Sequence, residues 1–343
     1  MDLSIIVPAF NRKEVLQPCL EAILAQLQAG DELLVIDDAS DWPVREYLEE
    51  LEKGNEQLKT YHLQVNCGQG HARNHGASLS KNEIIVFIDS DVQLLEGNLS
   101  QMRQFFSLYP ESSAVTGRLS LKHPYHSYFS RYKNAYMNYI FGLQSFDVNF
   151  LYGSICAIKK KDFLPWPEKF LGVEDTELGM TLTAQGKKIT FMPELEVVHF
   201  KNYSFGSLIK NDFFVPFGFA RSFWLFEGWR AYLPIPSKGK TKNFSHILPT
   251  QVYSLLVVMI SLLSAYYFPW KVWSVFLAMY LILNLKFFHF LATAEGFLFA
   301  LLSVLWTFVD QLVMLFGAVC GLIYHGAYLF IRPIFRLGAT IEK

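Results

Sequence analysis

Three long apolar stretches near the end of this 343-residue chain limit most strongly what it can fold into. They cover residues 248–268, 272–285 and 296–331, and the last 96 residues contain only five Lys or Arg and three Asp or Glu. A helix needs about 20 apolar residues to cross ~30 Å of hydrocarbon. The first stretch has this length, the second reaches it only by continuing past Lys286, and the third suits one tilted helix or a hairpin broken near Asp310. We therefore expect an α-helical transmembrane region with two to four crossings, which excludes a wholly soluble or wholly disordered chain.

A segment rich in basic and aromatic residues, 201–247, precedes this transmembrane region, 248–331. It contains seven Lys or Arg but only Asp212 and Glu227 as acids, so the positive-inside rule predicts that the preceding part of the chain lies in the cytosol. A short basic tail, 332–343, is expected on the same side of the membrane as residues 1–200, which favours an even number of crossings. The aromatic rings between the basic side chains favour an amphipathic stretch in the headgroup region, and a solvated linker is the alternative.

Residues 1–200 show a repeated pattern of short buried strands, each followed by a helical pattern. The apolar runs that predict strands cover residues 3–7, 33–36, 58–63 and 83–88. Such alternation predicts right-handed βαβ units and a doubly wound, mostly parallel sheet. In sheets of this kind the ligand lies beyond the carboxyl ends of the strands.

Acidic side chains occupy those strand ends. Asp37 and Asp38 follow the second run, and Asp89 and Asp91 follow the fourth. Gly68-Gln69-Gly70 lacks the third glycine of a dinucleotide fingerprint, and no phosphate-binding GxxxxGK[ST] loop occurs. Carboxylates repel a diphosphate unless a divalent cation lies between them, so the Asp-x-Asp triplet predicts a metal site for a nucleoside diphosphate.

Charge and cysteine usage exclude other classes of protein. The formal net charge of −1 argues against a nucleic-acid-binding protein. The four cysteines are scattered without a CxxC pair, which favours neither a disulfide framework nor a zinc site and suits a reducing compartment. The first residues, MDLSIIVPAFN, are too short an apolar run for a signal peptide, so we expect residues 1–200 at the cytosolic face of the cell membrane.

Five motifs in order give residues 1–200 a specific resemblance. They are SIIVPAFN at 4–11, DDAS at 37–40, GHARNHG at 70–76, DSD at 89–91 and GVEDTEL at 172–178. With these motifs the chain resembles the inverting family 2 glycosyltransferases of the GT-A fold, in particular the membrane-anchored bacterial type. The resemblance implies a nucleotide-sugar site with a Mn²⁺ or Mg²⁺ cofactor.

The resemblance also implies roles for individual residues of the donor site. Pro8 and Asp38 are expected around the nucleobase and ribose, and Arg73 near the pyrophosphate. Asp89 is expected at the ribose or at a metal-bound water, and Asp91 as a direct metal ligand. The family most often uses UDP, so a UDP-sugar is the expected donor.

Residues 174–178 carry the expected catalytic base. An inverting transfer to a hydroxyl needs a group that removes the proton, and the family assigns this position to Asp175, with Glu174 beside it at the acceptor. The alternative is structural, because Glu174, Asp175 and Glu177 would also suit the N-terminal dipole of a helix over 176–185.

Four further residues are candidates for the site. His199 ends an apolar strand, and a histidine at a similar place completes the metal shell in several relatives, which would favour Mn²⁺. Gly153 and Ser154 resemble the acceptor-side strand of the family, although a packing glycine explains them as well. Arg118 is a candidate for contact with a diphosphate or an anionic acceptor.

The region before the apolar stretches lacks the Gln-x-x-Arg-Trp motif of processive polysaccharide synthases. We therefore expect transfer of a single sugar to a lipid-linked acceptor, either a polyprenyl phosphate or a lipid-linked glycan. Two alternatives stay open: a sugar-nucleotide nucleotidyltransferase, and a non-catalytic membrane subunit with a degenerate transferase domain. The sequence leaves the oligomeric state open.

Overall fold

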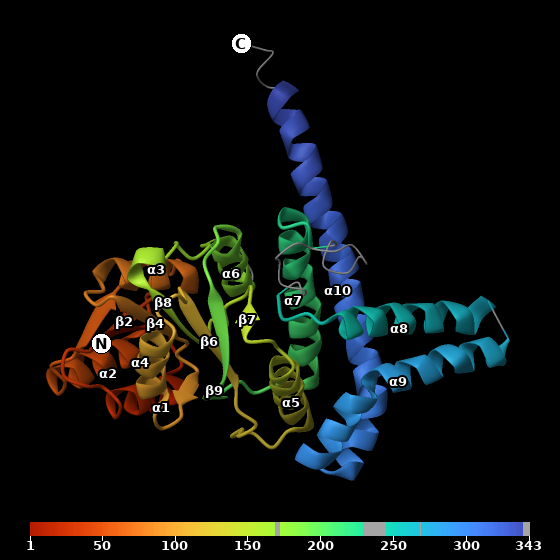
Figure 1. The fold of residues 1–343 in the computed structure, drawn as a ribbon, viewed down its shortest axis with the longest axis horizontal. Coiled ribbons are helices and arrows are strands. Elements are labelled where there is room, and N and C mark those ends of the chain that lie inside the picture. Colours follow the sequence, from red (N-terminus) through yellow and green to blue (C-terminus); the bar gives the residue numbers. More distant parts are fainter. Residues whose placement is uncertain (169–171, 229–244, 268, 339–343) are drawn as a thin grey trace. The chain divides into compact units, whose positions relative to one another are not determined.

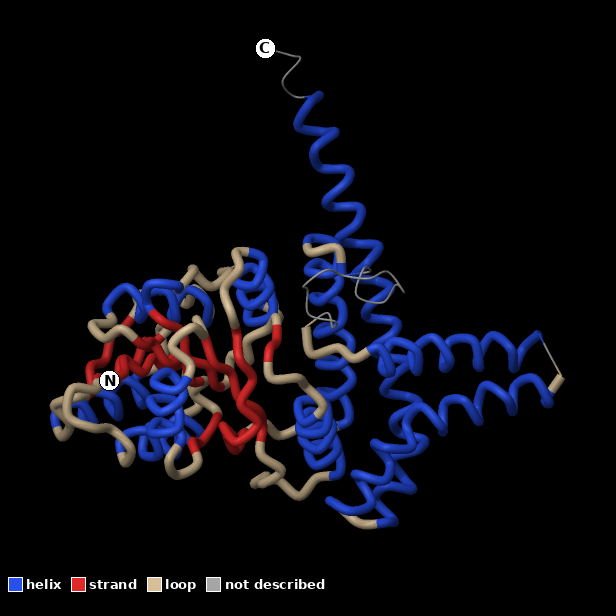
Figure 2. The backbone as a smooth tube through the Cα atoms, in the orientation of Figure 1, coloured by secondary structure: helices blue, strands red, loops and turns tan. Residues whose placement is uncertain are grey.

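The computed structural model describes residues 1–168, 172–228, 245–267 and 269–338 (Figure 1). The chain divides into two compact units. The first contains residues 1–170 and 174–202, and the second contains residues 171–173 and 203–343. All described strands belong to the first unit, and the described elements of the second unit are helices (Figure 2).

The first unit is a sheet with helices on both faces. Its strands are β1 Leu3–Ala9, β2 Glu32–Asp37, β3 Leu58–His62, β4 Ile84–Ile88, β5 Val92–Leu94, β6 Ala114–Leu119, β7 Asp147–Val148, β8 Ile155–Lys159 and β9 Ile189–His199. Its helices are α1 Lys13–Leu24, α2 Trp42–Lys53, α3 Gln69–Leu79, α4 Asn98–Leu108, α5 Tyr128–Gly142 and α6 Glu174–Ala184, with a 3₁₀ turn at Lys160–Asp162.

The strand order is β3-β2-β1-β4-β8-β6-β9-β5, with β7 paired to β9. The first four strands are parallel, as the sequence pattern predicts, so the doubly wound α/β class is confirmed. Beyond β4 the sheet becomes mixed, because β8 runs antiparallel to both β4 and β6 and β5 runs antiparallel to β9. This reversal brings segments from the second half of the unit to the carboxyl end of β4.

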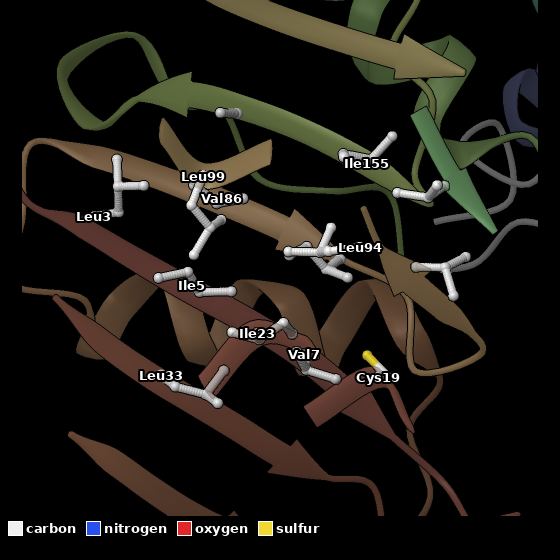
Figure 3. Close-up of a cluster of buried hydrophobic side chains, with 14 of the residues drawn as sticks. Leu3, Ile5, Val7, Cys19, Ile23, Leu33, Val86, Leu94, Leu99 and Ile155 are labelled. Carbon is white, nitrogen blue, oxygen red and sulfur yellow. The ribbon is translucent and has the colours of Figure 1, made fainter. Parts of the chain in front are cut away.

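The strands read as continuous apolar runs because both faces of the sheet are covered. Leu3, Ile5 and Val7 of β1 point into one cluster, together with Cys19 and Ile23 of α1 (Figure 3). The intervening Ile6 belongs to a second cluster on the opposite face. With no solvent-facing position, alternation disappears from the sequence, as is typical of parallel sheets.

The second unit contains α7 Phe205–Leu225, α8 Pro249–Tyr267, α9 Trp270–Ala294 and α10 Phe297–Gly338. Two of its helical segments, Trp270–Ala294 and Phe297–Tyr328, are long and apolar enough to cross a membrane. Only 28% of each of these windows is buried, whereas a soluble protein's core helix would be mostly buried. The third apolar stretch forms one continuous helix through Asp310, so the alternative of a hairpin at this residue is wrong.

The helix α7 takes up much of the basic and aromatic segment. One face of α7 packs along α10, where a Cβ atom on Gly317 or Gly321 would lie 2.1 or 2.4 Å from the carbonyl oxygen of Phe213 or Phe217. Glycine is therefore required for this close approach. That face of α7 is buried by protein, unlike the predicted amphipathic stretch in the headgroup region. The predicted basic residues Arg230, Lys238, Lys240, Lys242 and Lys343 lie outside the described residues.

Candidate active site

Pairing between β5 and β9 brings Asp91 and His199 together. Asp89-Ser90-Asp91 connects β4 to β5, and His199 lies opposite Val92 in the β5–β9 register. The amide of Phe200 donates a hydrogen bond to the Asp91 carbonyl over 2.7 Å. His199 Nε2 consequently lies 3.3 Å from Asp91 Oδ1, although the two residues are far apart in the sequence.

Positive groups surround the Asp91 carboxylate. Burial raises its pKa, but the hydrogen bond and charge of His199, together with the charges of Lys201 and Arg12, hold the pKa of Asp91 below its usual range. Arg12 Nη1 lies 3.5 Å from Asp91 Oδ2. The carboxylate is therefore ionised at neutral pH and lies in an environment that already favours a cation beside it.

Asp89 is held by an arginine and a serine. Arg73 Nη2 donates to Asp89 Oδ1 over 2.5 Å, and Ser154 Oγ donates to Asp89 Oδ2 over 3.0 Å. These two contacts fix both carboxylate oxygens. Asp89 therefore has a defined orientation at the end of β4, next to Asp91.

Arg73 is enclosed by other side chains of the site. Its side chain is 1% exposed, it pairs with Glu174 over 3.2 Å as well as with Asp89, and its guanidinium lies 4.3 Å from the centre of a Trp166 ring. Arg73 positions the two carboxylates that it joins, and its predicted place near the pyrophosphate stays a prediction.

Asp175 lies at the start of α6 and accepts two backbone hydrogen bonds. Its Oδ2 accepts from the Gly153 amide over 3.0 Å, and its Oδ1 accepts from the Thr176 amide over 2.7 Å. Burial and the neighbouring Glu174 raise the pKa of Asp175 to about 7, against the lowering effects of the two amides and Arg73. A carboxyl group with this pKa is poised to gain and lose a proton near neutral pH.

Glu174 lies behind Asp175 and not at an open acceptor surface. It is 4% exposed, accepts from Gln69 Nε2 and Arg73 Nη1, and its Oε2 atom is buried without a hydrogen-bond partner in the described part of the chain. Glu174 has an electrostatic effect on Asp175, and its expected contact with the acceptor stays a prediction.

The nucleobase candidates differ in their surroundings. Asp38 accepts from the amides of Cys67 and Gly68 over 2.8 and 2.7 Å, which ties the end of β2 to the loop before α3. Pro8 is buried inside β1, opposite Ile36, and its predicted contact with the nucleobase stays a prediction. The exposed group at this strand end is Phe10, with 48% of its surface accessible.

Gly153 and Ser154 join the two halves of the site. The Gly153 amide contacts Asp175, and the next residue, Ser154, contacts Asp89. A Cβ atom on Gly153 would lie 3.0 Å from Arg73 Nη2, so the absence of a side chain here leaves room for the arginine. Arg118 does not join this cluster, because its guanidinium donates to the Pro193 carbonyl and pairs with Glu196 at 2.8 Å. The predicted contact of Arg118 with a diphosphate or acceptor stays a prediction.

Three residues of the site were missing from the sequence prediction. Gln69 contacts Glu174, Trp166 covers Arg73, and Arg12 contacts Asp91. Gln69 and Arg12 lie within or beside motifs that the sequence analysis singled out, and this position was a usable signal. Trp166 lies outside all five motifs, and only the folded chain brings it to the site.

The side chains at this end of the sheet suit a divalent cation whose remaining ligands come from a bound diphosphate and water. The described part of the chain holds no group of three His, Cys, Asp or Glu side chains arranged as a metal site. Asp91 and His199 do supply one carboxylate oxygen and one imidazole nitrogen at the same place. Because Mn²⁺ and Mg²⁺ accept diphosphate and water oxygens as further ligands, this pair fits either ion.

A mixed α/β sheet with acidic residues at the carboxyl ends of its strands is typical of the GT-A fold. Residues 4–164 match the family model described as glycosyl transferase family 2. Residues 4–164, a little under half of the chain, thus form a glycosyltransferase family 2 domain.

Individual relatives agree with this assignment over part of their length. The GalNAc(5)-diNAcBac-PP-undecaprenol beta-1,3-glucosyltransferase of Campylobacter jejuni is 35% identical over 104 residues, 30% of this chain and 33% of the relative. The poly(ribitol-phosphate) beta-glucosyltransferase of Bacillus spizizenii is 28% identical over 123 residues, 35% of this chain and 19% of the relative. The chain thus matches a third or less of the length of these curated relatives.

A solved structure resembles more of the chain. The mannosyltransferase PcManGT from Pyrobaculum calidifontis, in complex with GDP-Man and Mn²⁺, has a TM-score of 0.60 over 89% of this chain and 87% of its own. Its sequence is 16% identical, so the likeness establishes the GT-A fold alone.

Proposed function

We propose that this chain transfers a single sugar, with inversion, from a nucleoside-diphosphate sugar to a hydroxyl group of a lipid-linked acceptor. The observation that carries the proposal is the Asp175 carboxyl, which two backbone amides orient and whose pKa is about 7. UDP is the nucleotide we expect. The catalytic unit works at the cytosolic face of the cell membrane, which the helices of the second unit cross more than once.

The chemistry of a hydroxyl acceptor requires a base. A hydroxyl oxygen that attacks the anomeric carbon must lose its proton as the bond to the diphosphate breaks, and a base with a pKa near the operating pH is the most effective. Asp175 has such a pKa. Glu174 keeps it high, and the Gly153 amide fixes the direction of one oxygen.

Asp91 and His199 are the residues that would hold Mn²⁺ or Mg²⁺, and the ion would supply positive charge to the departing diphosphate. Asp89 shares this end of the sheet and is held by Arg73 and Ser154. We infer that Asp89 binds the ribose or a water beside the ion. Gly153 contacts Asp175 and the adjacent Ser154 contacts Asp89, so one short segment positions a carboxylate on each side of the proposed site.

Two observations support a lipid-linked acceptor. The helices α9 and α10 contain segments long and apolar enough to cross a membrane, and such an anchor keeps an enzyme beside lipid substrates. The Campylobacter relative is described by its name as acting on an undecaprenol-linked glycan. A polyprenyl phosphate is the alternative acceptor, but its oxygen is already ionised and would leave Asp175 without a proton to remove.

The test incubates membranes containing the full chain with UDP-sugars and GDP-sugars, with and without Mn²⁺ or Mg²⁺, and identifies the lipid-extractable product. We expect one sugar added to a hydroxyl, with the anomeric configuration inverted as measured by NMR. If no donor is turned over under any of these conditions, the proposed transferase activity is contradicted. A sugar phosphodiester product would show that the acceptor is a phosphate and not a hydroxyl. Release of pyrophosphate from a nucleoside triphosphate would indicate nucleotidyl transfer instead.

A further inference from the structure

The turn between β1 and α1 has an unusual backbone. Asn11 and Arg12 are consecutive non-glycine residues with φ of 52° and 55°, in the left-handed region. Asn11 is held there by the loop after β2: its amide donates to Ser40 Oγ over 2.7 Å, and its side-chain oxygen accepts from the Asp41 amide over 2.8 Å. Asparagine tolerates this conformation, but arginine has no local reason to adopt it.

The consequence of this backbone is the position of the Arg12 side chain. The guanidinium lies 3.5 Å from Asp91 Oδ2, donates to the Phe200 carbonyl over 3.4 Å, and has Glu14 at 3.8 Å. Its side chain is 51% exposed. Arg12 is thus a solvent-accessible cation against the carboxylate that is the best candidate for a metal ligand.

A guanidinium and a divalent cation repel each other when both lie against one carboxylate. Arg12 therefore competes with the ion for Asp91 and has to move when the ion arrives. The diphosphate that accompanies the ion offers the guanidinium a new partner, because arginine matches phosphate oxygens with paired N–H donors. Arg73, the other arginine of the site, is buried and lacks this freedom.

We propose that Arg12 is a diphosphate-binding residue that exchanges partners. It pairs with Asp91 in the free enzyme, releases this carboxylate to the cation, and then binds a phosphate oxygen of the donor. The inference rests on the proposed function, since it requires a nucleoside diphosphate and a cation at this end of the sheet. Arg12 is then expected to weaken binding of the cation alone and to strengthen binding of the nucleotide.

The neighbouring Lys13 provides a matched control. It carries the same charge one residue further on, but its Nζ lies 4.8 Å above the Tyr47 ring, toward α2. Lys13→Ala removes a positive charge at nearly the same place in the sequence without removing a contact to Asp91. Arg12→Asn removes the guanidinium and keeps a residue type that tolerates the left-handed backbone. Arg12→Lys keeps the charge but loses the paired donors.

The experiment measures binding by the full chain in detergent micelles. Binding of Mn²⁺ alone is followed by the loss of the free-ion EPR signal, and binding of UDP and of GDP with Mn²⁺ by calorimetry. In Arg12→Asn we expect Mn²⁺ alone to bind about two- to five-fold more tightly, since an exposed competing charge is removed. We expect the nucleotide with Mn²⁺ to bind about 10- to 100-fold more weakly, because a charged hydrogen bond is lost.

The outcomes separate this inference from the proposed function. Wild-type protein that binds neither UDP nor GDP with Mn²⁺ would contradict the proposed donor site, whatever Arg12 does. Wild-type protein that binds them, with Arg12→Asn indistinguishable from Lys13→Ala in both assays, would overturn the role of Arg12. Arg12→Lys should fall between the two variants for the nucleotide. Melting temperatures of all three variants check that the turn still folds, and if Arg12→Asn does not fold, Arg12→Lys decides by the same nucleotide measurement.

Discussion

The two units of this chain arrange polar and apolar side chains in opposite ways. In the first unit the strands are apolar and buried, and the charged groups gather where the strands end. In the second unit a hydrogen-bonded group of polar side chains is buried: Asn284 of α9 donates to Ser254 of α8, and Ser254 and Gln311 of α10 complete the ring. Most of the exposed large apolar side chains in the described residues belong to these helices.

The difference is the one expected if the two units fold in different surroundings. A unit folded in water buries apolar surface and leaves its charges where solvent or ligand reaches them. Helices in lipid gain no hydrophobic free energy by burying leucine, and they associate through close packing and hydrogen bonds between helices. The glycines of α10 against α7 and the Ser254–Asn284–Gln311 ring are the two features that this second environment favours.

The largest effect is expected where the first unit concentrates its charge. Asp175→Asn keeps the shape of the side chain but removes the base, so transfer should fall by about 10²- to 10⁴-fold. The measurement is the initial rate of sugar transfer at saturating donor. Asp147→Asn, which neutralises an exposed acid paired with Lys188 in the same unit, is the control and should be neutral. Retention of appreciable activity by Asp175→Asn would favour a phosphate acceptor.

The next prediction tests the surroundings of the second unit directly. Leu305 of α10 and Leu108 of α4 are exposed to similar extents, 73% and 63%. If α10 lies in lipid, Leu305→Lys should cost about 2.5–3.5 kcal/mol of insertion, whereas Leu108→Lys replaces one water-facing side chain with another. The fraction of chain that resists alkaline extraction from membranes measures the difference. Equal behaviour of the two variants would contradict a membrane environment for α10.

The pH dependence of the transfer rate tests the role of Asp175 in the first unit. The base acts only when deprotonated, so with a pKa of Asp175 of about 7 the rate should fall about tenfold per pH unit below 7 and level off above it. Stability changes in the opposite direction. The pKa of Asp175 is raised in the folded state, so its contribution is fully present below its usual range and is lost as pH rises through about 7.

Asp175→Asn therefore should raise the melting temperature of the first unit more at pH 8 than at pH 5. The rate profile is measured with the wild-type chain, and the melting temperatures with both chains at the two pH values. A rate that does not change between pH 5 and 8 would show that Asp175 is not the titrating base.

Local patterns in the sequence determine much of the fold. Continuous runs of Val, Ile and Leu predict β1, β2 and β4 because both faces of these strands are covered, and the motifs place Asp91 and Asp175 at the ends of elements. The reversal of β8 and the pairing of β5 with β9 depend on contacts between distant segments, so the mixed part of the sheet was not predicted.

The same limit applies to the surroundings of the candidate site residues. A buried arginine and an exposed one look alike in a motif, so the burial of Arg73 under Trp166 and the pairing of Arg118 with Glu196 could not be predicted. These depend on which side chains the fold places beside each guanidinium. The contact of Arg12 with Asp91 likewise depends on two residues that adopt a left-handed backbone.

The smallest effect is expected inside the helical unit. Asn284→Ala removes the amide that donates to Ser254 and the oxygen that accepts from Gln311 over 3.0 Å. Hydrogen bonds between helices in lipid contribute about 0.6 kcal/mol on average and up to about 1.7 kcal/mol, so we expect a loss of this size and not loss of the fold. Denaturation of the full chain in mixed micelles measures it. Ser274→Ala on the same helix is the control, because Ser274 is partly buried and its hydroxyl donates to the carbonyl of Lys271 in its own turn, outside the polar ring. A loss several times larger for Asn284→Ala would mean that protein contacts beyond α8, α9 and α10 also shield the polar ring from water. An effect equal to that of Ser274→Ala would mean that the ring does not hold these helices together.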